Sequence, residues 1–281
     1  MSSIQQPPLV STTYSAYRFR YQWRLASLAN GLKDATAYRF EFFLEFFGSA
    51  AVPALIQWIL WYAIYITGGK TEITGLSYEQ MLAYTWMSVL FSQVRGGNHD
   101  FALMEMIRSG SLSNYLLRPV SPVEFVYIRG VGEKLFVMTV CLTIGLGLTL
   151  FTDLSAKNMI AAMGMALIGN IIHYQIGAII ATLAFLWEEA YSILMVKNMI
   201  VQILSGELIP LNMFPEHLHW VWKITPFYLY VYGPTQYALG RWTDAQYLEA
   251  LWIGVAWMIG LTFLIKLTWR LGIKRYLSLG G

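Results

Sequence analysis

The stretch SGELIPLNMFPEHLHWVWKITPFYLYVYGPTQYALG, residues 205–240, decides the fold of this chain. It is apolar and rich in aromatic residues, yet glycine and proline interrupt it at Gly206, Pro210, Pro215, Pro226, Gly233 and Pro234. None of the uninterrupted pieces has the roughly 20 apolar residues that a helix needs to cross a bilayer. Broken apolar helices at membrane depth are tolerated only where protein or a water-filled cavity satisfies their backbone. The stretch therefore predicts a re-entrant helix pair over residues 210–240, and with it a polytopic membrane protein that handles a substrate.

The composition of the chain agrees with a membrane protein. Of its 281 residues, 57% are hydrophobic and only 12% are charged, about half the charged fraction that is usual in soluble domains. The net charge of +3 does not indicate a nucleic-acid partner, because the basic residues lie in separate loops. The single cysteine, Cys141, lies in an apolar run and excludes a disulfide within the chain. Lipid is therefore the solvent for most of this sequence.

Hydropathy predicts an all-α protein with six transmembrane helices. The second is the most polar of the six, because it contains Thr85, Ser88, Ser92 and Gln93. We place the spans at residues 42–67, 79–95, 135–152, 158–186, 190–209 and 249–269.

The basic residues predict the orientation of these spans. Three groups lie before the first span, between the second and third, and after the sixth, and the opposite side holds only Lys70, Lys157, Lys223 and Arg241. Because basic residues accumulate on the cytoplasmic side, both termini and the loop 96–134 are expected in the cytoplasm. The re-entrant pair then enters from the outside, between the fifth and sixth spans.

Residues 1–41 are expected to form a cytoplasmic tail and an amphipathic helix, ahead of a permease domain over residues 42–281. Apolar side chains recur on one helical face at Tyr17, Tyr21, Leu25, Leu28 and Leu32. With arginines flanking that face, the pattern is typical of a helix lying in the membrane interface. The alternative is a water-exposed helix packed on the rest of the protein.

A second amphipathic element runs over residues 98–108, in the predicted cytoplasmic loop. Leu103, Met106 and Ile107 gather on the face expected to pack on the permease itself. The opposite face carries the residues that we predict to contact a partner protein: Phe101, Met104, Glu105 and Arg108. The alternative is an inert loop helix.

The chain has no recognisable nucleotide site of its own. Gly69-Lys70-Thr71 resembles the end of a phosphate-binding loop, but Ile64 stands where that motif needs its first glycine. The four histidines have no cysteine or carboxylate set at metal-ligand spacing. No serine nucleophile motif is present. We therefore expect no enzyme activity, metal site or cofactor in this chain.

Several polar residues fall inside or beside apolar spans. For His173, Gln175 and Lys197 we favour hydrogen bonds between helices, or for Lys197 extension to the inner interface, over a role in a substrate path. The candidates for the substrate pathway are Gln57, Gln93, Gln202 and Glu207. Glu207 is the strongest of these, because it lies beside the break that starts the re-entrant segment.

Taken together, these features resemble the integral-membrane permease subunit of type-2 ABC exporters. Three groups of residues carry the resemblance, which covers most of the chain: Ala37-Tyr38-Arg39-Phe40-Glu41-Phe42; Ile107-Arg108-Ser109-Gly110-Ser111-Leu112 followed by Tyr115-Leu116-Leu117-Arg118-Pro119-Val120-Ser121; and Ser205-Gly206-Glu207-Leu208-Ile209-Pro210 with Phe214-Pro215 and Thr225-Pro226-Phe227.

The resemblance implies a division of labour between chains. Two permease copies or paralogues would form the pathway, lined by spans one, two and five, while a dimer of separate ATPase subunits binds ATP and Mg²⁺. Residues 98–108 would be the coupling helix that contacts the ATPase. The expected location is the bacterial cytoplasmic (inner) membrane, in contact with lipid.

Two rival functions remain open from the sequence. A secondary transporter would need ionisable residues near the middle of the membrane, for which His173 is the central candidate. A membrane-embedded transferase would need catalytic carboxylates or histidines clustered at one face, and the sequence shows no such cluster.

Overall fold

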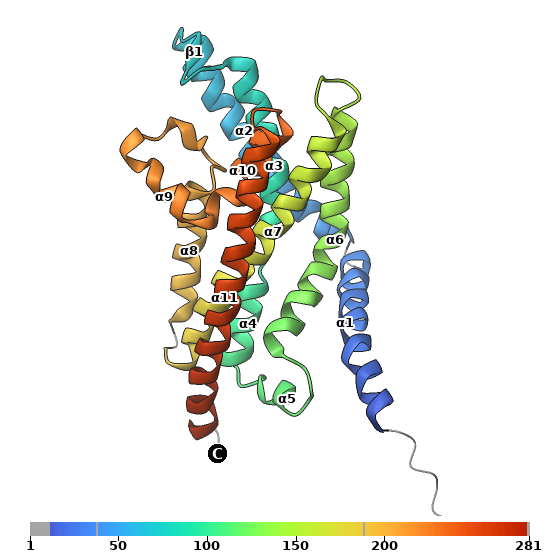
Figure 1. The fold of residues 1–281 in the computed structure, drawn as a ribbon. Helices are drawn as coiled ribbons and strands as arrows, with labels where there is room; N and C mark the ends of the chain where they lie inside the picture. The colour runs from blue at the N-terminus through green and yellow to red at the C-terminus, as the bar shows by residue number, and fades with distance from the viewer. Residues whose placement is uncertain (1–11, 38, 188, 280–281) are drawn as a thin grey trace, which may run out of the picture.

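The fold is known from a computed structural model that describes residues 12–279 except 38 and 188. The described part is almost entirely helical (Figure 1). Its only strands, β1 (Glu72–Ile73) and β2 (Leu76–Ser77), form a two-stranded antiparallel hairpin in which Glu72 lies opposite Ser77.

The longer helices are α1 (Thr12–Ala37), α2 (Arg39–Tyr62), α3 (Tyr78–Arg95), α4 (His99–Arg108), α6 (Pro122–Leu148), α7 (Ala156–Ala181), α8 (Ala190–Leu204) and α11 (Asp244–Leu279). The shorter ones are η1 (Ala63–Thr67, a π-helix), α5 (Ser113–Leu116), η2 (Thr182–Phe185), η3 (Leu211–Met213), η4 (Glu216–Leu218), α9 (His219–Ile224), η5 (Pro226–Leu229) and α10 (Tyr232–Ala238).

Local sequence explains where several of these helices begin and end. Ser77 and Gln80 form a capping box at the start of α3, which satisfies backbone donors that would otherwise lack partners. The Ser121 hydroxyl accepts a hydrogen bond from the Glu124 amide at the start of α6. Beyond α8 the chain turns through Gly206, whose φ of +79° lies in the left-handed region that favours glycine.

Four helical segments are long and apolar enough to cross a membrane: Phe43–Thr67, Pro122–Leu148, Ala156–Phe185 and Asp244–Tyr276. Two of them differ from the predicted spans, because α6 begins at Pro122 rather than at residue 135 and α11 continues to Leu279 rather than to residue 269. The predicted second and fifth spans are not among the four. The polar residues of α3 lower its hydropathy, and α8 ends at Leu204 after 15 residues.

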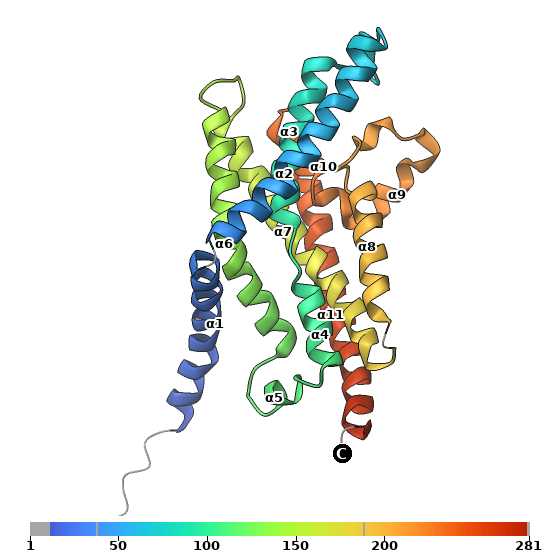
Figure 2. The same ribbon diagram turned by 180° about the vertical axis from the view of Figure 1, so that it is seen from behind.

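The helix α7 is the centre of the molecule. It contacts α3, α4, α6, α8, α10 and α11. In its most apolar window 61% of the residues are buried, against 11% to 22% in the other three candidate spans. Figure 2 shows α2 and α3 running together toward the β-hairpin, away from α4 and α5. The exposed apolar side chains of the outer helices suit a lipid environment.

The amphipathic helix predicted before the first span corresponds to α1, which packs along α6 (Figure 1). Ser27 and Ala35 are buried, whereas Leu25 and Leu32 are exposed. The side chains of Tyr17 and Tyr21 lie outside the described residues. The packing on α6 is compatible with both interpretations of this segment, so its location in the membrane interface stays a prediction.

The interrupted stretch 205–240 forms five short helices, η3, η4, α9, η5 and α10, where the sequence predicts a helix pair. In Figure 1 it lies in orange beyond the end of α8 and leads into α11. Leu229, Tyr230 and Val231 are fully buried in the main core around α7. The breaks are thus confirmed, and entry of this segment into the membrane from one side stays a prediction.

Candidate functional site

A buried ion pair joins α4 to α8. The Lys197 ammonium lies 2.5 Å from an Asp100 carboxylate oxygen and 3.4 Å from Nε2 of His173 on α7. The side chains of Lys197 and Asp100 are only 6% and 2% exposed. Two charges at such depth persist because each neutralises the other. The interpretation that Lys197 extends to the inner interface is therefore wrong, whereas hydrogen bonding between helices is confirmed.

Two glycines make room for the first residues of α4. A Cβ atom at Gly177 of α7 would lie 2.3 Å from Oδ2 of Asp100, and one at Gly130 of α6 would lie 2.1 Å from Nδ1 of His99. Any other residue type at either position would force the Asp100 or His99 side chain to move. The start of α4 is thus seated against both α6 and α7, a contact that spacing in the sequence does not reveal.

A second ion pair joins the end of α3 to the residues after α8. The Arg95 guanidinium lies 2.5 Å from a Glu207 carboxylate oxygen, and both side chains are largely buried. A hydrogen bond also fixes the backbone next to Glu207, because the Tyr84 hydroxyl donates to the carbonyl of Gly206 at 2.5 Å. Glu207, the strongest predicted pathway residue, therefore has a charged partner.

The two ion pairs have a common pattern. The α3–α4 region contributes a cation and then an anion, Arg95 and Asp100, and the α8 region contributes Lys197 and then Glu207. Each cation pairs with the anion of the other region, so the two regions are held side by side in opposite directions. The residues between α3 and α4 include Gly96 and Gly97, which lie between the two attachment points.

The structure brings only some of the predicted pathway residues together. The Gln57 amide donates to the backbone carbonyl of Glu207 at 3.4 Å. Gln93 is buried and exchanges hydrogen bonds with Ser49 of α2, at 3.0 and 3.1 Å. Gln202 is exposed on α8. Gln57 and Glu207 are thus neighbours, while Gln93 and Gln202 have separate surroundings, and a role of the four in a substrate pathway stays a prediction.

The hydrogen bonds of Gln175 confirm the favoured interpretation of that residue. Its amide donates to the carbonyl of Met258, at 3.1 Å, and to the hydroxyl of Thr262, at 2.8 Å. Both acceptors belong to α11, so this polar side chain fastens α7 to α11. Bonds of this kind between membrane helices contribute roughly 0.6–2 kcal/mol each.

The predicted partner-binding face of α4 needs one correction. Met104 is only 2% exposed and packs in the same cluster as Leu103 and Ile107. It therefore faces inward, because α4 is enclosed by α6, α7 and α8 and buries more of its circumference than a helix packed on one surface. Glu105 and Arg108 are exposed, as predicted, and form an ion pair at 3.6 Å.

Phe101 is intermediate between the two faces of α4. Its ring is half-buried and lies 5.1 Å from the ring of Tyr191 on α8, measured between centroids. Offset aromatic pairs at this distance are favourable. Phe101 therefore contributes part of its surface to the contact with α8 and leaves part of it free.

A hollow of about 790 Å³ lies beside the outer face of α4. Its rim includes Leu117, a large apolar side chain that is 88% exposed. The sequence prediction missed this hollow, although the adjacent leucines 116 and 117 in a polar loop were a signal for it. The lining residues are Ala102, Glu105, Met106, Ser109, Ser111, Asn114, Tyr115, Leu117 and Arg118.

His99 is the residue of α4 whose charge state burial changes most clearly. Burial, with a smaller contribution from the positive charge of Lys134, lowers the pKa of His99 from 6.5 to about 4. The imidazole is therefore neutral at physiological pH, as its position against Gly130 requires. Among the described residues no group of three histidine, cysteine or carboxylate side chains is placed to hold a metal ion.

Comparison with protein families gives one match. The family model described as "ABC-2 family transporter protein" matches residues 51–280, from the middle of α2 to beyond the end of α11. No curated protein and no solved structure matches the chain. The match covers well over half of the sequence, and it includes both ion pairs and the hollow beside α4. The chain therefore belongs to the ABC-2 transporter family, as a multi-pass membrane permease of the type-2 ABC class.

Proposed function

We propose that this chain is the transmembrane permease subunit of an ATP-driven ABC exporter. It forms the substrate pathway as a dimer with a second permease copy or paralogue, while separate ATPase subunits bind ATP and Mg²⁺. The observation that carries the proposal is α4, one side of which borders an accessible hollow while the other is held to α8 by a buried ion pair. Family membership supports a transport subunit with an ATPase partner.

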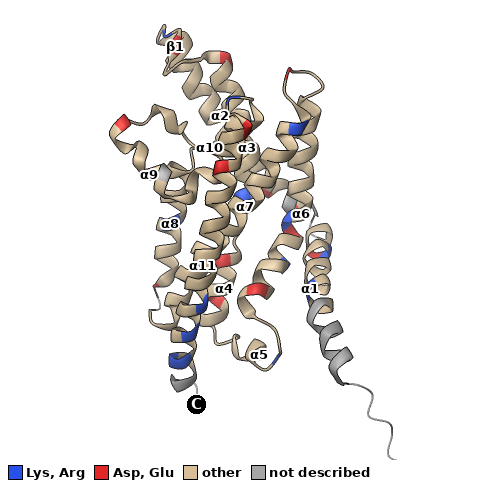
Figure 3. Ribbon diagram, in the orientation of Figure 1, with Lys and Arg blue, Asp and Glu red and all other residues tan. Residues whose placement is uncertain are grey.

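In this proposal α3 and α8 also cross the membrane, which makes six spans. Both lie within the helical bundle and contact α7. Figure 3 shows lysine and arginine residues near the C-terminal end of α11, and the same end of the bundle holds α4 and α5 (Figure 1). The excess of basic residues there supports a cytoplasmic location for this end and for both termini, in the bacterial inner membrane.

The ATPase would bind at the hollow beside α4. Glu105 lines the hollow and pairs with Arg108, so charged groups lie where they can steer a partner. Leu117 supplies an exposed apolar anchor of the kind that interfaces bury at their centre. Phe101 adds the exposed part of its ring, and Met104 supports α4 from inside rather than contacting the partner.

Movement of α4 would be transmitted to α8 through the buried charges. If α4 moved without α8, Asp100 and Lys197 would separate, and an unpaired buried charge costs about 3–5 kcal/mol. The two regions are therefore expected to move together, with Gly96 and Gly97 allowing α4 to change its angle relative to α3. The ion pair between Arg95 and Glu207 would carry this change to the break after α8.

The substrate pathway would lie between two permease copies. Gln202 is a polar side chain exposed beside the exposed apolar side chains of Met199, Ile200 and Ile203 on α8. In a membrane such a group requires a partner or water, and a pathway between two copies provides both. Gln57 and Glu207, which are in contact, would line the same region from α2 and the break after α8, with Gln93 behind them.

The first experiment tests the binding of the ATPase. We expect Leu117→Asp combined with Glu105→Lys to abolish co-purification of the ATPase that accompanies the unmodified chain in mild detergent. Leu150→Asp is the matched control, since Leu150 is similarly exposed, at 80%, but lies in the loop between α6 and α7. Co-purification that is equal for all three proteins would show that the ATPase does not bind at this hollow.

A secondary transporter is the second candidate, and the Asp100, Lys197 and His173 cluster is the observation that favours it. Ionisable residues at membrane depth are what a coupling-ion site needs. The two functions differ in their energy source. Substrate movement by reconstituted permease and ATPase should require ATP and continue without an ion gradient; movement driven by a gradient in the absence of the ATPase would favour the second candidate.

A further inference from the structure

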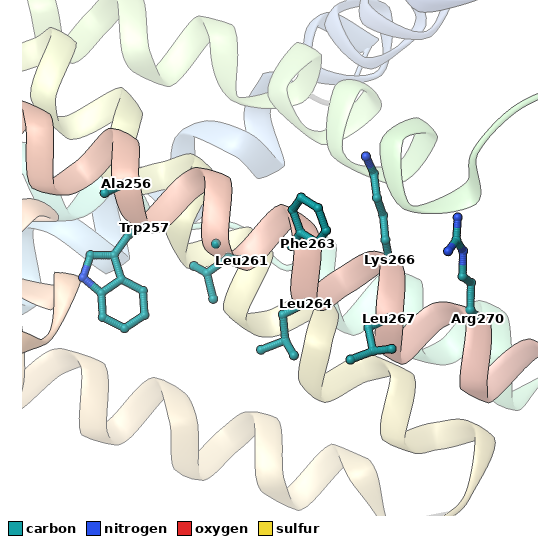
Figure 4. A pocket seen from close by; sticks show the side chains of 9 residues that line it. Ala256, Trp257, Leu261, Phe263, Leu264, Lys266, Leu267 and Arg270 are labelled. Carbon is teal, nitrogen blue, oxygen red and sulfur yellow. The ribbon is translucent and has the colours of Figure 1, made fainter.

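Two basic residues on α11 point to the same side of that helix. Lys266 and Arg270 are four residues apart, and Figure 4 shows both side chains extending toward the same neighbouring helix. That helix is α6, because the hollow that the two residues line also includes side chains from its first turns. Both are exposed, and neither forms an ion pair with any described residue.

These two basic residues are shared by two adjoining hollows. One, of about 410 Å³, lies between α6, α7 and α11 and has Tyr127 and Trp269 among its lining residues. The other, of about 910 Å³, runs along α11 and is lined mostly by apolar side chains, of which Phe263 extends to the same side as Lys266 and Arg270 (Figure 4). The combined surface is apolar along most of its length and cationic where the two hollows meet.

No acidic group of the two hollows is free to neutralise these cations. Glu124 is the one carboxylate among the lining residues of either hollow. Its carboxylate already lies 2.6 Å from the guanidinium of Arg24 on α1. The place where the hollows meet therefore has an uncompensated positive charge at the edge of an apolar surface.

We propose that this groove binds an anionic phospholipid. Lys266 and Arg270 contact the phosphate, since arginine and lysine both bind phosphate oxygens through charge-assisted hydrogen bonds. Trp269 lies beside the headgroup, where tryptophan is favoured at membrane interfaces. The acyl chains follow the apolar hollow past Phe263, which extends to the same side of α11 as the two basic residues. A soluble phosphate would use only the cationic end, whereas a phospholipid matches both parts. This inference goes beyond the proposed transport function and requires only that the chain is embedded in a membrane.

The experiment compares two pairs of charge removals on the same helix. Lys266→Gln with Arg270→Gln removes the proposed site, and Lys274→Gln with Arg275→Gln removes equal charge from exposed residues outside both hollows. The full-length chain, purified and delipidated in mild detergent, is titrated with phosphatidylglycerol, phosphatidylcholine or glycerol phosphate. Native mass spectrometry and thermal unfolding report binding.

We expect the first pair to weaken the apparent affinity for phosphatidylglycerol roughly 25-fold, about fivefold for each basic residue. Arg270→Gln alone should weaken it about fivefold, which keeps the test informative if the double variant folds poorly. The control pair should bind like the unmodified chain, and phosphatidylcholine should bind weakly to all of them.

Three results would overturn the proposal. The first is equal loss of phosphatidylglycerol binding in both pairs, which would indicate a diffuse effect of charge. The second is glycerol phosphate binding as tightly as the lipid, which would leave the apolar hollow without a role. The third is that the first pair changes the self-association of the chain but leaves lipid binding unaltered. That result would assign this face to a second copy of the chain.

Discussion

At the residue scale, the main feature of the core is a buried ion pair whose separation would leave an unpaired charge at a high cost in free energy. Asp100 and Lys197 are 97 positions apart in the sequence and meet in the interior of the bundle, where neither can be solvated. The contact with His173 adds a third polar group from α7. Pairs of this kind contribute less to stability than their number of hydrogen bonds suggests, but removing one partner is costly.

We expect Lys197→Met to lower the free energy of unfolding by about 3–5 kcal/mol, because Asp100 then has no charged partner. Combining it with Asp100→Asn should recover most of the loss. Lys157→Met is the matched control. Lys157 pairs with Asp244 at 3.2 Å, but both are exposed, and such pairs contribute only about 0–1 kcal/mol. Denaturant unfolding in detergent measures all of these, and a Lys197→Met variant as stable as the control would contradict the role of the buried pair.

The space around Asp100 gives a second prediction at this scale. Gly177→Ala should destabilise the protein by about 1–3 kcal/mol, since the new Cβ would displace the Asp100 carboxylate. Gly164→Ala is the control on the same helix. No atom lies within 4 Å of a Cβ at Gly164, so the change should be neutral or should stabilise by up to about 1 kcal/mol through helix propensity. Thermal unfolding of the two variants measures the difference. Equal shifts in Tm would argue against close packing of α4 on Gly177.

At the scale of elements, α4 is buried at one end and exposed at the other. Its first turn is locked into the bundle by His99 and Asp100, and its last turn carries exposed charges beside a hollow. The end of α11 also contacts this region, because the Tyr276 hydroxyl donates to the carbonyl of Gly110 at 3.0 Å. A force applied at the hollow would therefore reach α7, α8 and α11 through direct contacts.

Acidification should loosen this element. The pKa of His99 is about 4 in the folded protein against 6.5 when unfolded, so between these values the unfolded state binds more protons and stability falls as the pH falls. The full effect is about 3 kcal/mol. After correction for the intrinsic exchange rate, hydrogen exchange of the α4 amides should accelerate as the pH decreases from 6.5 to 4. His99→Asn should flatten this dependence, and a steep dependence retained in that variant would assign the effect to another group.

At the scale of the whole molecule, the most buried helix is surrounded by helices that expose apolar surface. Trp58 and Ile59 of α2 and Trp252, Phe263 and Leu271 of α11 are examples of such exposed side chains. Lipid can cover these surfaces in a multi-pass membrane protein of this family, and the proposed second permease copy would cover part of them. The short helices after α8 connect it to α11, and the side of the membrane on which they lie is a prediction.

Accessibility of single cysteines tests this arrangement. Asn212→Cys and Thr243→Cys, each in a Cys141→Ser background, lie on either side of the segment 213–242 and should both react with a membrane-impermeant thiol reagent from outside intact cells. The reason is that no helix between them is long enough to cross a bilayer. If one of the two reacts only after permeabilisation, the segment crosses the membrane and the proposed topology is wrong.

The sequence by itself determined the class of this protein and its main interruption. Transfer from water to lipid depends on composition and on the length of apolar runs, so a chain with 12% charged residues and the broken stretch 205–240 could be recognised without coordinates. The absence of a complete phosphate-binding loop is likewise a local property of the sequence.

Only the tertiary structure decided which distant residues meet and which side of a short helix is buried. Helical spacing places Met104 near Glu105 on the helix surface, but it does not say that three neighbouring helices enclose α4 and cover Met104. The pairing of Asp100 with Lys197 depends on the mutual placement of α4, α7 and α8, including the space that Gly177 leaves. Periodicity describes one helix at a time, whereas the stability of a buried charge depends on the partner that packing brings to it.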